Sequence, residues 1–399
     1  MNYDEAISYI HSLERFGSRP GLDRISDLLK MLGDPHKKIK CVHIAGTNGK
    51  GSVSAMISSA LMESGFKTGL FVSPFVIDFR ERIQINGEFI KKSDLAELID
   101  RVRSLADGMA DHPTEFELVT AVMFCWFAQQ KVDYAVLETG LGGRLDSTNV
   151  VIPEVSVITK ISLDHTRVLG DTVEQIAAEK AGIIKAGVPV VLAPEQPAGA
   201  LKVIRDTAQR LNAPLYETDC SRQFELGLKG RHQQQNAAAA FKALQLLGLS
   251  EDKILSGLYK AYMPARLETL CKDPEVILDG AHNPDGAAAL AEYIGGKKPV
   301  AVMGMMRDKD TEKIMSTIAP LCRAVVAVTV DGQPRSADAR TICDLASKYC
   351  DAYEADSYVS ALETADRIRD KNPIVICGSL FLASGIRDIA IKRYNTTTK

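Results

Sequence analysis

The sequence predicts an α/β protein of two domains, each built on a parallel sheet that helices cover. Short apolar runs of strand length alternate with helical patterns along most of the chain, which is typical of such sheets. The length of 399 residues exceeds what a single hydrophobic core usually organises. Strands are predicted at residues 42–44, 70–72, 134–137, 155–159, 189–192, 276–278, 300–303, 325–330 and 374–377. Helices are predicted at residues 94–105, 117–129, 173–181, 236–247 and 286–293.

Local patterns justify the order of these elements. After the strand at 42–44 and a glycine-rich turn, apolar residues recur at helical spacing across 53–61, and Gly65 is a suitable helix stop. The strand at 70–72 completes a strand–helix–strand unit. In the helix at 94–105, the apolar residues fall on one face. The later elements continue this alternation, so we expect parallel strands joined by crossover helices.

A domain boundary is predicted close to residue 264. The segment 233–262 has a helical pattern, and a new strand–helix series begins at Val276. We therefore expect an N-terminal domain of residues 1–264 and a C-terminal domain of residues 265–399. The polar tail is expected to be frayed.

Composition and charge narrow the classes of partner. Hydrophobic residues make up 46% and charged residues 25% of the chain, and 48 basic and 51 acidic residues give a net charge of −3. This balance argues against nucleic acid or an anionic membrane as the main partner. No apolar run reaches membrane-spanning length, and the acidic segment 1–5 is unlike a secretion signal. The eight cysteines include no C-x-x-C pair, so we expect reduced thiols, no zinc site and a cytoplasmic protein.

The stretch 41–54 has the order that phosphate binding requires: an apolar strand, a glycine-rich turn and a helix. Such a turn aims backbone N–H groups at an anion, and the helix adds the positive end of its dipole. Lys50 can place a charge beside the phosphates, and Ser52 can offer a hydroxyl to Mg²⁺. The strict P-loop pattern fails at Ile44 and Gly51, so a glycine-rich turn with an incidental lysine is the alternative. The strand–helix–strand context favours phosphate binding.

Polar side chains also end two further predicted strands. Glu138 follows an apolar strand and precedes a glycine-rich loop, at the place where open α/β sheets bind ligands. Its carboxylate suits a hard cation such as Mg²⁺, although the alternative is a carboxylate capped by its own loop. Asp164 and His165 follow the next strand along the chain. A single histidine is more often a packed or surface residue than a ligand, but its place after the Glu138 loop favours a metal site.

Two other segments carry polar residues at the ends of elements. Lys180 lies in the last turn of a predicted helix, where lysines usually complement the helix dipole, and the residues alone indicate no more. Asp279 ends a predicted strand before a His-Asn-Pro turn that opens a helix. Asp279 could take a ribose hydroxyl and His282 a phosphate or carboxylate. The alternative is an Asx-type turn at the start of a helix.

Taken together, these segments resemble the folylpolyglutamate synthase family, which includes bifunctional dihydrofolate synthases and belongs with the Mur-type ATP-dependent ligases. The resemblance spans residues 43–384. Its motifs lie in the family's order at residues 46–52, 73–74, 79–83, 114–117, 138–146, 164–166, 179–183, 236–239, 265–266, 278–284 and 378–380. Phe75 replaces a histidine that many relatives carry, and the chain is somewhat short for the family, so we expect a trimmed surface loop.

The resemblance implies an N-terminal P-loop-type ATPase domain with a parallel sheet, joined to a smaller C-terminal Rossmann-like α/β domain, with the active site in the cleft between them. It implies an ATP-dependent ligase of folate and one-carbon metabolism that adds L-glutamate to the γ-carboxylate of (tetrahydro)folate through an acyl phosphate. Whether dihydropteroate is accepted too stays open. The implied cofactors are ATP and Mg²⁺, and the partners are the small-molecule substrates folate, L-glutamate and ATP. The protein is expected to be a monomer.

The resemblance also assigns roles residue by residue. Residues assigned to the triphosphate are Asn48, Gly49, Lys50, Gly51 and Ser52. Residues assigned to Mg²⁺ are Ser52, Ser73, Glu138 and His165. Further assignments are Asn236, Arg266 and Asp279 to the nucleotide, Thr114, Glu115, Phe116 and Glu117 to the pterin or folate, and His282 to the phosphate or the incoming glutamate. Lys180 matches a lysine that family members carbamylate, and with Lys50 and His282 it completes the predicted catalytic set.

Two other functions stay open. One is a Mur-type amide ligase with a different acceptor, such as a cell-wall precursor, although the motifs at 114–117 and 138–146 favour folate. The other is a non-catalytic nucleotide switch or motor-like NTPase, which leaves the 279–284 turn without a task. Phosphate release that requires both folate and glutamate separates the ligase from the switch.

Overall fold

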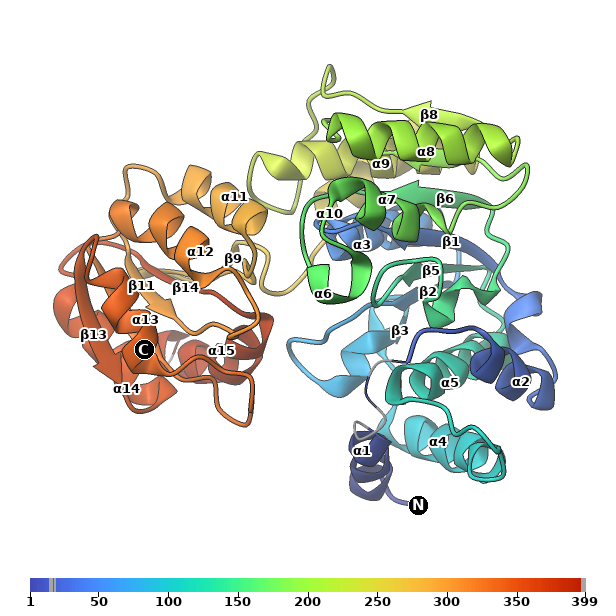
Figure 1. Ribbon diagram of the computed structural model, residues 1–399, viewed down its shortest axis with the longest axis horizontal. Helices are drawn as coiled ribbons and strands as arrows, with labels where there is room; N and C mark the ends of the chain where they lie inside the picture. The colour runs from blue at the N-terminus through green and yellow to red at the C-terminus, as the bar shows by residue number, and fades with distance from the viewer. Residues whose placement is uncertain (14–16, 18, 396–399) are drawn as a thin grey trace. The chain divides into compact units, whose positions relative to one another are not determined.

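The computed structural model describes residues 1–13, 17 and 19–395 (Figure 1). The chain divides into two compact units: unit 1 comprises Met1–Gly227 and Gln234–Tyr262, and unit 2 comprises Leu228–Gln233 and Met263–Lys399. Unit 2 thus includes a short segment that we expected in the N-terminal domain, because Lys229 in that segment donates a hydrogen bond to the Thr269 hydroxyl of unit 2. The end of the predicted frayed tail, residues 396–399, lies outside the described residues.

The sheet of unit 1 has the strand order β4-β3-β2-β5-β1-β6-β7-β8. Its strands are β1 (Lys40–Ala45), β2 (Thr68–Phe71), β3 (Ile83–Ile85), β4 (Glu88–Phe89), β5 (Tyr134–Glu138), β6 (Val155–Ile158), β7 (Val190–Leu192) and β8 (Leu215–Glu217). At one edge, β3 pairs antiparallel with both β2 and β4, and all other neighbouring strands pair parallel. Since β2 and β5 lie on one side of β1 and β6 on the other, the strand order changes direction at β1.

Helices enclose this sheet. They are α1 (Tyr3–Ser12), α2 (Asp23–Met31), α3 (Lys50–Glu63), α4 (Lys92–Ala106), α5 (Glu115–Gln130), α6 (Thr166–Leu169), α7 (Val173–Ala181), α8 (Ala198–Arg210), α9 (His232–Leu246) and α10 (Glu251–Lys260), with 3₁₀ turns at Pro35–Lys38, Phe79–Arg82 and Ser147–Val150. α1, α2, α4 and α5 share one apolar core with the sheet, and α7 and α8 share another. α3 is buried along its middle because α10 packs closely on it: a Cβ on Gly257 would overlap Ala60.

Unit 2 contains a second sheet with the order β13-β12-β11-β14-β10-β9. Its strands are β9 (Glu268–Lys272), β10 (Glu275–Leu278), β11 (Val300–Met303), β12 (Ala324–Val328), β13 (Asp351–Ala355) and β14 (Ile374–Cys377). Its helices are α11 (Pro284–Ile294), α12 (Thr311–Ile318), a 3₁₀ turn (Ala319–Leu321), α13 (Ala339–Ala346), α14 (Tyr358–Ile368) and α15 (Leu380–Asn395). Only β9 runs antiparallel among these strands, so the predicted α/β class with parallel-rich sheets is confirmed.

Every predicted strand and helix has a counterpart, with ends shifted by a few residues. β3, β4, β8, β9 and β13 were not predicted. These strands are short or lie at sheet edges, where polar residues break the apolar runs on which the prediction depended. In β13, for example, Asp351, Tyr353 and Glu354 are exposed.

Two expectations about the protein's class can be compared with the structure. Within the described ranges, no helix has the length and apolarity needed to cross a membrane. All eight cysteines lie within the described residues, and all are free thiols. Burial raises the pKa of the Cys41 thiol to about 12, so this side chain is a packed apolar group rather than a reactive thiolate.

Candidate active site

The loops that follow β2, β5, β1 and β6 meet at one edge of the unit 1 sheet, because these strands are parallel neighbours. Ile44 pairs in register with Glu138, so this carboxylate lies beside the end of β1. The backbone N–H of Ser73, after β2, donates to Glu138 Oε2 at 3.4 Å. Predicted metal ligands and the glycine turn are therefore neighbours at the point where the strand order changes direction.

The glycine turn between β1 and α3 is tightly enclosed. Gly46 and Gly49 have φ angles of 156° and 92°, which glycine reaches at low cost. A Cβ on Gly46 would overlap the Thr159 hydroxyl, and a Cβ on Gly49 would overlap the amide oxygen of Asn236. The turn and Asn236, both predicted to contact nucleotide, thus lie against each other. Since α3 begins at Lys50, the N–H groups of its first turn are available to an anion.

Thr47 connects this turn to the loop after β6. Its hydroxyl donates to the Ser162 carbonyl at 3.0 Å and accepts from the Ser162 N–H at 3.1 Å. The backbone N–H groups of Thr47 and Asn48 both donate to the Lys160 carbonyl, and Asn48 Nδ2 donates to Ser162 Oγ at 3.3 Å. These bonds preorganise the turn and join it to the loop that carries His165.

Two lysines converge on the turn. Lys50 Nζ donates to the carbonyls of Gly46 and Thr47 at 3.1 and 3.2 Å, and Lys180 Nζ donates to the same Gly46 carbonyl at 2.7 Å. Burial and the nearby Lys50 charge lower the pKa of Lys180 to about 7, against a smaller opposing effect of Asp164. The interpretation of Lys180 as a simple helix-end lysine is therefore wrong. When Lys180 is protonated, two ammonium groups lie beside one carbonyl, and an anion at this place would offset their repulsion.

Oxygen atoms for a cation lie at the same edge. Glu138 is 4% exposed and Ser52 is 2% exposed. His165 precedes α6 with φ 50°, and its Nε2 is 3.9 Å from Asp164 Oδ1. Among the residues that the structure describes, no group of three or more His, Cys, Asp or Glu side chains is arranged to hold a metal. Hydroxyls and one carboxylate fit Mg²⁺, which takes few protein ligands when it also binds phosphate; the assignment of Ser73, Glu138, His165 and Ser52 stays a prediction.

A buried hydrogen-bond network holds the loop after Glu138. Asp146 accepts from the Leu141 N–H at 2.9 Å and from the Thr148 N–H and hydroxyl at 3.0 and 2.5 Å. Thr148 Oγ1 also lies 2.8 Å from His43 Nε2. Burial raises the pKa of Asp146 and lowers the pKa of His43 to about 3. His43 was not predicted as a site residue, although a histidine within an apolar strand is a signal that could have indicated it.

The residues assigned to the pterin or folate have structural partners of their own. Thr114 and Glu117 form a capping box at the start of α5. Glu117 Oε2 also accepts from Arg24 Nε at 3.1 Å, in an ion pair that is almost fully buried. The ring of Phe116 packs so closely on Gly140 that a Cβ there would overlap it. These residues therefore shape the start of α5 and the loop after β5, and their contact with substrate stays a prediction.

Arg82 was missed as an individual site residue, although it lies in one of the predicted motifs. It pairs with Glu115, Nη1 to Oε1, at 3.1 Å. Its guanidinium lies 5.0 Å and 5.7 Å from the ring centroids of Phe79 and Phe75, which themselves pack edge to face. Phe79 is buried, whereas Phe75 and Arg82 are partly exposed next to the loop that carries Ser73. Their exposed parts are suited to a flat or acidic molecule.

In unit 2, the predicted nucleotide contacts gather at the end of β10. Asp279 is buried, and its carboxylate accepts from the Leu267 N–H at 2.8 Å and the Ala281 N–H at 2.9 Å. Burial raises its pKa, although the Arg266 charge acts in the opposite direction. Arg266 lies over Gly280, where a Cβ would stand 2.6 Å from Nη1. The structure thus brings Arg266 and Asp279 together, and their contact with nucleotide stays a prediction.

His282 and Asn283 form the following turn. His282 Nδ1 lies 2.8 Å from the Gly280 carbonyl, and Asn283 caps α11, so the Asx-type turn is present as well. His232 was not predicted. Its Nδ1 is buried and makes no hydrogen bond to the described residues. Burial lowers the pKa of His232, whereas the nearby Asp279 charge acts in the opposite direction.

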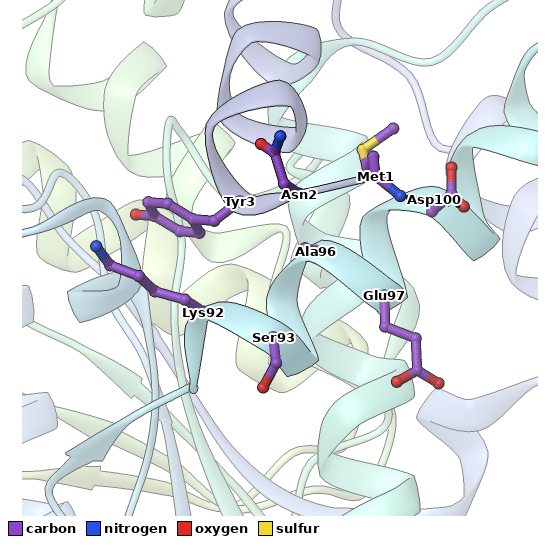
Figure 2. Close-up of a pocket in the computed structure, with 8 residues that line it drawn as sticks. All are labelled: Met1, Asn2, Tyr3, Lys92, Ser93, Ala96, Glu97 and Asp100. Atoms are coloured by element: carbon purple, nitrogen blue, oxygen red, sulfur yellow. Dashed lines mark ion pairs between the residues drawn. The ribbon is translucent and has the colours of Figure 1, made fainter.

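A separate hollow of about 380 Å³ lies between the start of α1 and α4. It is lined by Met1, Asn2, Tyr3, Lys92, Ser93, Ala96, Glu97 and Asp100 (Figure 2). Lys92 Nζ lies 4.8 Å from the centroid of the Tyr3 ring. No predicted site residue is part of this lining, so the candidate active site is placed at the sheet edge instead.

The chain is similar to two known protein families and to characterised relatives. The Mur ligase middle domain matches residues 44–197, and the Mur ligase glutamate ligase domain matches residues 265–380. The dihydrofolate synthase/folylpolyglutamate synthase of Bacillus subtilis is 38% identical over 96% of this chain and 98% of its own length.

Solved structures are also similar. Mycobacterium tuberculosis folylpolyglutamate synthase complexed with ADP and AMPPCP matches with a TM-score of 0.89 and 30% identity, over 98% of this chain and 99% of that chain. E. coli FolC in complex with DHPP and ADP matches with a TM-score of 0.87 and 29% identity, over 97% and 98% of the two chains. The two parallel-rich sheets, the glycine turn and these full-length similarities together establish that the chain belongs to the folylpolyglutamate synthase/dihydrofolate synthase family of Mur-type ligases.

Proposed function

We propose that this protein is an ATP-dependent ligase that adds L-glutamate to the γ-carboxylate of a folate, with tetrahydrofolate as an acceptor. The observation that carries the proposal is the pair of lysines, Lys50 and Lys180, on the carbonyl of a glycine turn at the carboxyl edge of a parallel sheet. The names of the relatives supply the class of reaction, and the nucleotides in the related structures support ATP as co-substrate.

The reaction needs no protein nucleophile. A carboxylate is a poor electrophile, so the γ-phosphoryl group of ATP first moves to an oxygen of the acceptor carboxylate and ADP is left. The glutamate amine then attacks the acyl carbon, phosphate leaves, and the amine nitrogen gives up a proton. Catalysis therefore reduces to positioning the reactants and neutralising charge on the moving phosphoryl group.

The residues of the glycine turn serve this chemistry directly. In the proposal, Asn48, the N–H groups of Gly49, Gly51 and Ser52 and the Lys50 ammonium hold the triphosphate. The backbone N–H of Asn48 itself donates to the Lys160 carbonyl. Thr47 keeps the turn closed before nucleotide arrives, since its two hydrogen bonds to Ser162 need no ligand.

Lys180 has a different role in the proposal. With a pKa of about 7, the Lys180 side chain is a neutral amine in an appreciable fraction of the protein molecules at neutral pH. A neutral amine adds to CO₂, whereas an ammonium does not, so burial prepares Lys180 for carbamylation. The carbamate would exchange a cation for an anion beside the proposed metal site.

We propose that Ser73, Glu138, His165 and Ser52 hold Mg²⁺, which supplies charge neutralisation at the phosphates when bound. Asn236, Arg266 and Asp279 contact the nucleotide. His282 stands by the phosphate or the incoming glutamate.

The acceptor is proposed to bind near the start of α5, at Thr114, Glu115, Phe116 and Glu117. The neighbouring Arg82, with its aromatic partners, supports an acidic and planar acceptor at this place. We further propose that the enzyme acts in the cytoplasm, which the free thiols support, and that it is a monomer.

The deciding experiment is ATP-dependent incorporation of radiolabelled glutamate, run separately with tetrahydrofolate and with dihydropteroate. Product with tetrahydrofolate supports the main proposal. Product with dihydropteroate supports a second activity, which the double name of the Bacillus subtilis relative favours. ATP hydrolysis that needs neither folate nor glutamate would instead indicate a nucleotide switch, and incorporation only with another acceptor would indicate a different amide ligase.

A further inference from the structure

The turn 265–267 of unit 2 is held in a conformation that its residues disfavour. Ala265 and Leu267 have φ angles of 54° and 47°, in the left-handed region that non-glycine residues seldom adopt because Cβ meets the backbone. Both residues are buried. Arg266, between them, is a proposed nucleotide contact. Strained backbone of this kind persists only where surrounding groups hold it in place.

Besides a bond within the turn from Arg266 Nη1 to the Ala265 carbonyl at 3.2 Å, three hydrogen bonds from neighbouring residues hold it. Glu268 Oε2 accepts from the Ala265 N–H at 3.0 Å, and Asp279 Oδ2 accepts from the Leu267 N–H at 2.8 Å. The Gly280 N–H donates to the Ala265 carbonyl at 2.8 Å. Two of these partners belong to the segment at the end of β10, whereas Glu268 reaches back from β9 and must itself be fixed.

Arg387, on α15, fixes Glu268. Its Nε lies 3.2 Å from both carboxylate oxygens, and its Nη2 donates to Oε1 at 2.6 Å. The two side chains are only 13% and 7% exposed, and they are 119 residues apart in the chain. The planar fork of an arginine matches a carboxylate in a way that lysine cannot. Neither residue belongs to the predicted site.

We propose that Arg387 and Glu268, which together form a clamp on the turn, are positioning residues for nucleotide binding. Arg387 fixes the Glu268 carboxylate, the carboxylate fixes Ala265 in its left-handed conformation, and the turn thereby holds the Arg266 guanidinium beside Asp279. The inference rests on the proposed nucleotide contact of Arg266. Without the clamp, Ala265 relaxes toward the right-handed region and the Arg266 side chain is redirected, so the loss falls on nucleotide affinity.

The test measures binding of ADP and AMPPCP by calorimetry, together with the KM for each substrate. Arg387→Lys keeps the charge and removes the fork, and we expect about tenfold weaker nucleotide binding, with a matching rise in the KM for ATP and little change in the KM for glutamate. The matched control is Arg393→Lys on the same helix, since Arg393 pairs with Asp366 of α14 at 2.7 Å. The control should bind nucleotide normally. If Arg387→Lys does not fold, Glu268→Gln, which keeps an oxygen for the Ala265 N–H, takes its place.

A rescue separates positioning from mere stabilisation. Glycine adopts a φ near 54° without support, so adding Ala265→Gly to Arg387→Lys should restore most of the lost affinity. If the ion pair only stabilised the unit, Arg387→Lys would lower the melting temperature and leave nucleotide affinity unchanged, so the glycine would have nothing to restore. Normal nucleotide affinity in Arg387→Lys, or failure of the glycine to restore it, overturns the proposal.

Arg266→Ala distinguishes this failure from failure of the proposed function. Weak binding by Arg266→Ala beside normal binding by Arg387→Lys rejects the clamp alone. Normal binding by Arg266→Ala rejects the nucleotide contact of Arg266, and the clamp with it. Because nucleotide binding is measured without an acceptor, the result is independent of whether folate proves to be the substrate.

Discussion

The molecule has two turns with left-handed backbone beside proposed nucleotide contacts, and it obtains them by opposite means. In unit 1, Gly46 and Gly49 reach positive φ because they have no side chain, and neighbouring groups fill the space a Cβ would need. In unit 2, Ala265 and Leu267 reach it against their own preference, because carboxylates such as that of Glu268 bind their N–H groups. The first turn depends on residue type and the second on hydrogen-bond partners.

This difference has a physical reason in each place. In the proposed function a phosphate approaches the backbone of the glycine turn directly, so any side chain there would block the ligand and would also overlap the neighbouring loop. The turn in unit 2 instead presents a side chain, Arg266, and its backbone can be enclosed by protein groups. The glycine turn should therefore be sensitive to substitutions within it, and the clamped turn to substitutions of its distant partners.

The largest effect is expected from the charged groups of the glycine-turn site. Lys50→Ala and Glu138→Ala should each lower kcat by about 10³-fold or more, because in the proposed mechanism Lys50 offsets charge on the moving phosphoryl group and Glu138 holds the Mg²⁺ that does the same. Glutamate incorporation measures the rate, and the melting temperature checks that the variants are folded. Glu63→Ala, at the far end of α3, where the carboxylate pairs with Lys260 at 2.8 Å, is the matched control and should keep its rate. Nearly normal rates in either site variant would remove that residue from the mechanism.

A smaller but still large effect is expected from Gly49→Ala. The new Cβ overlaps the amide oxygen of Asn236, so the turn and this proposed nucleotide contact must move apart, and the KM for ATP should rise about 100-fold. Gly65→Ala is the control, because Gly65 also has a left-handed φ, 86°, but a Cβ there meets open space. It should lose about 1 kcal/mol of stability and keep its KM. Equal KM values in the two variants would show that the close contact with Asn236 is unimportant.

Local signals are enough to predict one half of this comparison. Lys50 follows a glycine-rich turn, and Glu138 ends an apolar strand, so the sequence alone places both at the carboxyl edge of a sheet. The central strands are predictable for the same reason, since their apolar runs are continuous. Edge strands such as β9 and β13 are not, because their burial depends on tertiary neighbours that no short window contains.

In both turns, the contacts between segments far apart in the chain are outside the reach of local patterns. Glu268 and Arg387 are 119 residues apart, and Thr47 and Ser162 are 115 apart, so neither pairing leaves a periodic trace in the sequence. Lys180 shows the same limit: its place in a last helical turn is local, but the direction of its side chain toward the glycine turn is set by packing. Left-handed φ at a non-glycine residue is likewise a result of its partners.

The pH dependence of stability tests the electrostatics of the glycine turn. The pKa of Lys180 is about 7 in the folded protein and near its ordinary value of 10.5 when unfolded, so between these values the unfolded chain binds more protons. Stability should therefore rise with pH across this window, in the absence of nucleotide. Lys180→Met should flatten the rise in the urea midpoint between pH 7 and 9, whereas Lys202→Met, at an exposed position on α8, should not. An unchanged slope in Lys180→Met would mean that burial does not depress this pKa.

The smallest effect is expected from Ala265→Gly, and it bears most directly on the difference between the two turns. Glycine removes the cost of a left-handed φ, about 1 kcal/mol. It also removes a buried methyl group and raises the conformational entropy of the unfolded chain, and each of these changes destabilises the fold by a comparable free energy. These terms oppose one another, so the free energy of unfolding, measured by urea denaturation, should change by less than about 1 kcal/mol. A strongly stabilised variant would mean that the Glu268 and Asp279 hydrogen bonds leave most of the strain uncompensated. A strongly destabilised one would mean that the Ala265 methyl, rather than the carboxylates, organises the turn.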